Sequence, residues 1–302
     1  MLETIKIHIS EFNDFYTSIF KIKQTIDETG VCVLRGIDFS AEQQFEAMIA
    51  LGDTFGWYPN SKVKTKNYYL ENHEFTIKNK IDVLTIDVTN EKYRDRILVE
   101  WHMEHIGFIN PAVGASWNMK TFTCNKECGK TYFVDAHSVF CQLNEEDIDF
   151  LEKCQYALRS LDVKNESQYT EMGVLPNGSL YLNPIVNHKT LNLIKMVRIF
   201  PTNDANKHLE LISLDSKKPN QSESANFNRI CDTISNIIFL DTGIRITHKW
   251  RQHDFLICDL SRMYHAVTGG FRSDQRYFEG MWAYGNPGSK TRIEEDAANK
   301  DF

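Results

Sequence analysis

The stretch ILVEWHMEHIGF (residues 97–108) places a short polar motif inside an apolar frame. The apolar residues predict a strand over Ile97–Glu104, in which successive side chains point to opposite faces. His102 and Glu104 then lie on one face, and Met103 lies on the other. Imidazole and carboxylate ligands on one side of a metal leave positions open for co-substrate and oxygen, which suits non-haem Fe(II). A structural zinc site would instead be closed by four ligands, often thiolates.

The same H-x-E spacing occurs a second time, at His208-Leu209-Glu210, so the spacing alone does not identify a site. The second copy follows a polar stretch, residues 202–207, that is typical of a solvated loop or the start of a helix. The first copy has apolar neighbours that can exclude water from a metal. We therefore expect His102 and Glu104 to be ligands, with a buried core pair as the alternative.

Residues 250–265, WRQHDFLICDLSRMYH, resemble the strand–turn–strand that ends in the distal metal histidine of the TauD/TfdA family of Fe(II)/2-oxoglutarate dioxygenases. Asp259, Arg262 and His265 keep the spacing of that family. Arg276, eleven residues after His265, stands where the family's arginine binds the far carboxylate of 2-oxoglutarate. Further similar segments follow the family's order along the chain, and they are Gly30–Gly36, Leu51–Gly56 and Gly129–Asp135.

The resemblance implies a metal site and a 2-oxoglutarate site. The implied metal ligands are His102, Glu104 and His265, and the implied 2-oxoglutarate contacts are Arg276 and Thr131. An arginine fork meets a carboxylate bidentately, which a lysine does not. The alternative roles are a surface ion pair for Arg276 and a plain strand position for Thr131.

Three further charged residues of the similar segments are expected to be structural. We expect Asp259 and Arg262 to stabilise the turn before His265 rather than to contact substrate. Asp135 is expected to have a structural role as well.

The resemblance also implies the fold and the chemistry. The fold is mainly β with flanking helices, in the form of a distorted double-stranded β-helix, or jelly roll. The implied cofactor is Fe(II), and the implied co-substrates are 2-oxoglutarate and O2. The reaction would oxidise an unactivated C–H bond by hydroxylation, desaturation or oxidative cyclisation. The carboxylate of Glu104 argues against the halide-accepting variant of the site, which has Ala or Gly there.

Two departures from the family pattern bear on the substrate. Gly280 stands where many sulfonate- or carboxylate-oxidising relatives carry a second arginine, which disfavours taurine or an aryloxyacetate and is similar to the γ-butyrobetaine and trimethyllysine hydroxylase branch. Glu104 replaces the commoner Asp, as in clavaminate-synthase-like oxygenases that act on free amino acids. Together they predict a small molecule, an amino acid or amine derivative, as the substrate.

Candidate substrate residues follow from strand parity. If Arg276 points inward, Phe278, Trp282 and Tyr284 share its face, with Gly280 leaving space between them, and aromatic walls can hold a cationic or apolar group. Simple filling of the barrel is the alternative for these aromatics. His105 faces away from the iron in a regular strand, and a bulge would turn it toward the substrate or the metal ligands.

Two other function classes stay open. A non-catalytic sensor would bind 2-oxoglutarate or a metal without turnover. A protein-modifying oxygenase would need a long exposed groove and usually anchors 2-oxoglutarate differently.

Size and charge restrict the remaining possibilities. The chain has 302 residues without a linker-like or repeated stretch, which predicts one catalytic domain over residues 1–302. A net charge of −7, with acids spread along the chain, argues against a nucleic-acid partner. No stretch reaches the ~18 apolar residues of a membrane span, and the N-terminus lacks a signal-peptide core. We expect a cytoplasmic protein whose oligomeric state the sequence does not indicate.

Cysteine usage agrees with that compartment. Seven scattered cysteines, an odd number, fit a reducing environment better than a disulfide framework. Cys124 and Cys128 would suit a zinc knuckle, but no second pair follows at finger spacing.

Capping signals and periodicity predict three helices. The first begins at Ser40, with a capping box to Gln43, and continues through Leu51. The second begins at Asn144 and carries Ile148, Leu151 and Cys154. The third spans Ser222 to Leu240. Clusters of β-branched and aromatic residues predict strands. The predicted strands are Gly30–Gly36, Ile97–Glu104, Ala115–Phe122, Ser179–Leu182, Lys195–Arg198, Phe255–Leu260 and Tyr277–Tyr284.

Overall fold

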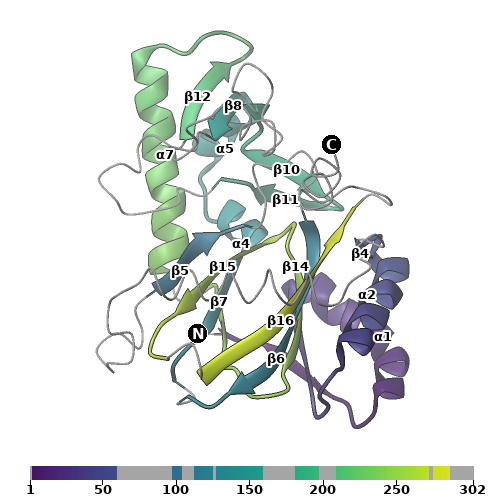
Figure 1. Cartoon of the computed structure of the whole chain (residues 1–302). Helices are drawn as coiled ribbons and strands as arrows, with labels where there is room; N and C mark the ends of the chain where they lie inside the picture. Colours follow the sequence, from purple (N-terminus) through teal and green to yellow (C-terminus); the bar gives the residue numbers. More distant parts are fainter. Residues whose placement is uncertain are drawn as a thin grey trace, which may run out of the picture.

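The computed structural model describes residues 2–59, 97–103, 112–124, 127–158, 181–196, 209–241, 243–271 and 275–285. Two mixed β-sheets face each other at the centre of the molecule, with helices on their outer sides (Figure 1). The six-stranded sheet has the order β2 (Ile5–His8), β3 (Val31–Arg35), β14 (Phe255–Asp259), β6 (Ala112–Phe122), β16 (Arg276–Tyr284), β4 (Tyr58–Pro59). The five-stranded sheet has the order β1 (Leu2–Glu3), β13 (Arg245–His248), β7 (Thr131–Asp135), β15 (Met263–Thr268), β5 (Ile97–His102).

The central strands of both sheets are buried on both faces. In β3, Val33 belongs to the cluster between the sheets, whereas Leu34 belongs to the cluster under the N-terminal helices. In β7, Phe133 faces the space between the sheets and Val134 faces the opposite side. Alternate residues of these strands therefore line the space between the sheets, as strand geometry requires.

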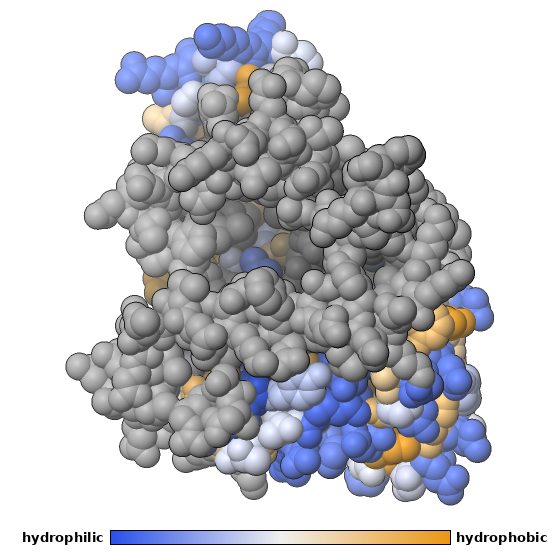
Figure 2. Space-filling model, viewed as in Figure 1, coloured by the Kyte–Doolittle hydropathy of each residue, from blue (hydrophilic) through white to orange (hydrophobic). Residues whose placement is uncertain are grey.

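Two helices cover the outer face of the six-stranded sheet, α1 (Phe12–Thr29) and α2 (Ala41–Phe55). The predicted capping box of α2 is confirmed: Ser40 Oγ accepts from the Gln43 amide at 3.2 Å, and Gln43 Oε1 accepts from the Ser40 amide at 2.9 Å. Apolar patches interrupt the hydrophilic surface over these helices (Figure 2). Within α1, Phe20 is 79% exposed.

A third layer covers the outer face of the five-stranded sheet. It contains α4 (Ala136–Phe140), α5 (Glu145–Glu152), α7 (Gln221–Leu240), the hairpin β10 (Ile185–His188) and β11 (Leu191–Ile194), and a small sheet of order β12 (Leu209–Leu214), β8 (Cys154–Leu158), β9 (Tyr181–Leu182). The predicted helices at Asn144 and Ser222 are confirmed as α5 and α7. None of the helices in the described ranges combines the length and apolar character that a bilayer crossing requires.

Most predicted strands are confirmed, and the confirmed ones are β3, β5, β6, β9, β14 and β16. Cys154 was expected in the helix after Asn144, but it begins β8 because its backbone pairs with Leu214 of β12. In the second H-x-E copy, Leu209 and Glu210 begin β12. His208 and residues 202–207 lie outside the described residues.

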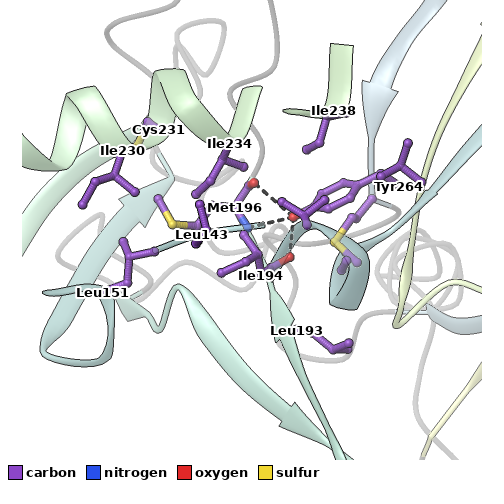
Figure 3. Close-up of a cluster of buried hydrophobic side chains, with 14 of the residues drawn as sticks. Leu143, Leu151, Leu193, Ile194, Met196, Ile230, Cys231, Ile234, Ile238 and Tyr264 are labelled. Atoms are coloured by element: carbon purple, nitrogen blue, oxygen red, sulfur yellow. Dashed lines mark hydrogen bonds between the residues drawn. The ribbon is translucent and has the colours of Figure 1, made fainter. Parts of the chain in front are cut away.

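The predicted strand Lys195–Arg198 was wrong at its start, because β11 ends at Ile194. The Lys195 amide donates to the Pro184 carbonyl at 2.8 Å, and tyrosine hydroxyls bind the other backbone groups near it. Tyr264 Oη accepts from the Met196 amide at 3.1 Å and donates toward the carbonyls of Ile194 and Met196 (Figure 3). Tyr156 likewise donates to the Lys195 carbonyl. Residues 197 and 198 lie outside the described residues.

The turn between β14 and β15 is held as expected by the three charged residues. Asp259 accepts from the Ser261 amide at 3.1 Å. Arg262 binds Asp135 with both ends of its fork, at 2.9 and 2.6 Å, and also donates to the Asp27 carbonyl at 2.7 Å. The Arg262–Asp135 pair anchors the start of β15 to the end of β7. It therefore fixes the position of the strand that carries His265.

We predict that Arg262→Met lowers the free energy of unfolding by about 3 kcal/mol, because it leaves the Asp135 carboxylate buried without its partner. Urea unfolding followed by circular dichroism measures the change. Lys6→Met is the matched control, since the Lys6–Glu3 pair is exposed and its removal should change stability by less than about 1 kcal/mol. Equal losses in both variants would show that the buried pair does not hold the turn.

Candidate active site

His102 and His265 meet across two neighbouring strands. They are Cα partners in the antiparallel pairing of β5 with β15, and their ring centroids lie 4.1 Å apart at an interplanar angle of 52°. His265 is 5% exposed. The structure therefore brings together two of the three predicted metal ligands, from positions that are far apart in the sequence.

Alternation along β15 directs His265 into the space between the sheets. Its neighbours Tyr264 and Ala266 belong to the cluster on the opposite, α7 side, where Tyr264 makes its backbone contacts (Figure 3). On the inner side, the His265 ring lies 5.5 Å from Trp117 and 6.1 Å from Phe133, measured between centroids. The two imidazoles thus lie beside an apolar wall.

The third predicted ligand, Glu104, and its neighbour His105 lie outside the described residues. Met103 is 4% exposed and packs in the α7-side cluster, so it points away from the face of His102, as predicted. Within the described ranges no group of three His, Cys, Asp or Glu side chains forms a metal site. The two imidazoles could supply two of the ligands of a divalent metal, which imidazole nitrogen binds well.

Arg276 begins β16 and is 5% exposed. Its guanidinium carbon lies 5.6 Å from the ring centroid of Trp250, 5.3 Å from that of Phe271 and 5.0 Å from that of Phe278. No carboxylate of the described residues pairs with it, and its Nε finds no hydrogen-bond partner there. Burial lowers the pKa of Arg276 to about 10.

Thr131 begins β7 and is 4% exposed. Its Oγ1 accepts from the indole Nε1 of Trp250 at 2.8 Å, and the same indole lies against Arg276. A hydroxyl has one proton to donate and can accept as well. Since the indole uses an acceptor position, the hydroxyl proton of Thr131 is available to an anion beside Arg276.

Strand β7 joins the arginine and histidine regions. Thr131 and Phe133 are two residues apart and so lie on the same face. Thr131 contacts Trp250, while Phe133 lies near His265. Both predicted sites therefore open on the same space between the sheets.

The predicted substrate residues of β16 also face this space. A register shift between Tyr277 and Phe278 interrupts the pairing with β6, yet Phe278 and Trp282 pack against the inner cluster. Gly280 is buried, and its Cα partner on β6 is Trp117. The inward orientation expected from parity is thus present despite the bulge.

Three aromatic residues of the site were not predicted. They are Trp117 and Phe271, which carry no motif, and Trp250, which begins the segment that resembles the family. Within the described residues, Cys124 and Cys128 belong to no group of three possible metal ligands, so the zinc-knuckle alternative gains no support.

Comparison with known proteins gives consistent results. Three solved structures share the fold: AAD-2 in complex with Mn(II) and N-oxalylglycine (15% identity, TM-score 0.59, covering 96% of this chain and 98% of that one), a putative α-ketoglutarate dependent 2,4-D dioxygenase from Burkholderia xenovorans (11%, 0.60, 94% and 94%), and a taurine dioxygenase from the same organism (10%, 0.58, 95% and 88%). No protein with a curated description matches by sequence. The family model described as taurine catabolism dioxygenase TauD, TfdA family matches residues 7–282. This chain therefore belongs to the TauD/TfdA family and is a 2-oxoglutarate-dependent non-haem iron dioxygenase.

Proposed function

We propose that this dioxygenase oxidises an unactivated C–H bond of a small molecule, an amino acid or amine derivative, by hydroxylation, desaturation or ring closure. The iron ligands in this proposal are His102, Glu104 and His265. Arg276 and Thr131 bind the distal carboxylate of 2-oxoglutarate. We further infer that the two sheets are the halves of a distorted double-stranded β-helix, in one catalytic domain.

The observation that carries the proposal is the environment of Arg276, a buried guanidinium with no acidic partner among the described residues. A buried charge without a counter-ion is unfavourable, so this position suits an anionic ligand. The planar fork accepts a carboxylate through two parallel hydrogen bonds. The AAD-2 complex contains N-oxalylglycine, which carries two carboxylates, as 2-oxoglutarate does.

The chain's own contribution is positioning. Arg276 and Thr131 hold one end of the co-substrate, and the apolar side chains beside the histidines exclude water from the reacting atoms. Iron(II), when bound, supplies the activation of O2 and the oxidation of the C–H bond. The imidazoles fix the position of the metal relative to the bound co-substrate.

The substrate class follows from what lines the remaining space. Phe278, Trp282 and Trp117 present aromatic surface there, and Gly280 leaves room between them. Aromatic faces attract cations and cover apolar groups. These features favour an amine-bearing substrate over one held by an anion clamp.

Loss of either imidazole should abolish turnover without unfolding the protein. We predict that His102→Ala and His265→Ala release no succinate from 2-oxoglutarate with Fe(II) and a panel of amino acids and amines, because a metal face with one ligand removed holds iron poorly. The wild-type protein releases succinate with at least one member of the panel. Binding of 2-oxoglutarate by the wild type without succinate release from any member would indicate a sensor, and turnover confined to peptides would indicate a protein-modifying oxygenase.

Arg276→Met should separate binding from stability. The substitution removes the fork, so we expect 2-oxoglutarate affinity to fall at least about tenfold. It also removes a buried unpaired charge, so the free energy of unfolding without ligand should stay equal or increase. Calorimetric titration and urea unfolding measure the two quantities.

Arg245 offers the matched control for Arg276. Its guanidinium also lies against two aromatic rings, Trp101 at 5.5 Å and Tyr132 at 4.9 Å, but it donates to the Phe239 carbonyl at 2.7 Å. Arg245→Met should therefore lose stability and keep 2-oxoglutarate affinity. A pattern in which Arg276→Met loses stability and retains affinity would contradict the assignment.

Gly129 is a second position where the arginine can be tested. Its φ is +58°, and a Cβ there would lie 3.0 Å from Phe271 Cδ1 and 3.2 Å from Arg276 Cδ. We predict that Gly129→Ala raises the 2-oxoglutarate requirement several-fold, because it displaces Arg276, and also lowers stability through left-handed backbone strain. Gly56→Ala is the control, since Gly56 has a φ of +71° with nothing within 4 Å of the added Cβ. Both variants should lose stability, and only Gly129→Ala should change the 2-oxoglutarate requirement.

A further inference from the structure

Trp250 forms the wall behind Arg276, and its orientation affects both predicted 2-oxoglutarate contacts. The indole is 2% exposed and donates to Thr131 Oγ1 at 2.8 Å. Its ring also lies parallel to Phe278, at 9° and 6.4 Å between centroids. A tilt of the indole would break the Thr131 hydrogen bond and alter the surface on which the guanidinium lies.

His248 packs against this indole in an edge-to-face arrangement. The ring centroids are 4.3 Å apart with an interplanar angle of 82°, an arrangement that aromatic pairs favour. His248 is fully buried at 0% exposure, and burial lowers its pKa, so the neutral imidazole is the form present. The proposed reaction gives this buried histidine no chemical task.

Both ring nitrogens of His248 face polar partners. Nδ1 lies 2.9 Å from Thr4 Oγ1, and Nε2 lies 3.2 Å from Asp254 Oδ2. The Thr4 contact depends on the first residues of the chain, because β1 pairs in parallel with β13 and so brings Thr4 beside His248. The Thr4 hydrogen bond fixes the rotation of the imidazole, and Nε2 faces the Asp254 carboxylate without a hydrogen-bond geometry.

Asp254 is in turn held by a fork and by the backbone. Arg35 Nε donates to Oδ1 at 2.6 Å and Arg35 Nη2 donates to Oδ2 at 2.9 Å. The Arg251 amide donates to Oδ2 at 2.9 Å. The charge of Arg35 is thus balanced by Asp254, and a neutral imidazole completes the group without adding charge behind the indole.

We propose that His248 is a positioning residue for 2-oxoglutarate: Thr4 and Asp254 orient its imidazole, the imidazole fixes the Trp250 indole, and the indole directs the Thr131 hydroxyl and supports Arg276. This inference rests on the proposed function of Arg276 and Thr131. A residue that merely fills the core would contribute to stability alone. A positioning residue changes the affinity for the co-substrate in addition.

The test uses the full chain with Mn(II) and N-oxalylglycine as the probe. Thr4→Val removes the hydroxyl that holds Nδ1 at nearly constant volume, and His248→Gln removes the aromatic contact. We expect each to weaken N-oxalylglycine binding about tenfold by calorimetric titration. Each should also shift the Trp250 indole N–H signal in a nitrogen–proton correlation spectrum, even without ligand.

Thr25→Val is the matched control, because Thr25 is also a buried threonine, at 5% exposure, with a hydroxyl that donates to the Lys21 carbonyl inside α1. It should lose comparable stability while affinity and the Trp250 signal stay as in the wild type. Wild-type affinity in both Thr4→Val and His248→Gln would overturn the positioning role alone. Failure of the wild type itself to bind N-oxalylglycine would overturn the proposed function and, with it, this inference.

Discussion

Burial of β15 on both faces is the constraint on which the rest of the site depends. A shift of one residue in its pairing would exchange His265 for Tyr264 and move an imidazole from the space between the sheets to the α7 side. Tyr264 opposes such a shift, because its hydroxyl is engaged by the backbone at Ile194 and Met196. The Arg262–Asp135 pair fixes the same strand at its start. The register that places His265 opposite His102 is therefore held at the start of β15 and from the α7 side.

Arg276, in the part of the site away from the two histidines, is a charged group that the ligand-free protein does not stabilise with an acidic partner. Arg276 keeps its charge in an aromatic environment where burial lowers its pKa, and cation–π contacts with three rings offset only part of the desolvation. A guanidinium in this state favours a carboxylate ligand more strongly than an exposed arginine would, because water competes less.

The sequence predicted the parts of this arrangement that local rules control. Side-chain alternation separated His102 from Met103, and the capping box located α2. Arg276 was chosen through the resemblance to the family rather than by a local rule. The sequence did not predict the end of β11, because that end is set by Tyr264 and Tyr156, which come from other strands. Nor did it predict Trp117, since its place near His265 follows from how β6 lies against the five-stranded sheet. Contacts between distant segments carry no local signal, and Glu104 and His105 lie outside the described residues.

Charge balance in the described part of the interior bears on the substrate. Three cations of the described residues are less than 10% exposed, and two of them face an acid: Arg262 faces Asp135, and Lys130 faces Glu127. The third, Arg276, has no acidic partner among the described residues, so it offers an uncompensated positive charge, enough for one carboxylate. If 2-oxoglutarate takes that position, an anionic substrate group finds no second cation there, and Gly280 supplies none. We infer that the aromatic surface, rather than a charge, selects the substrate, which favours a molecule whose recognised group is cationic or apolar.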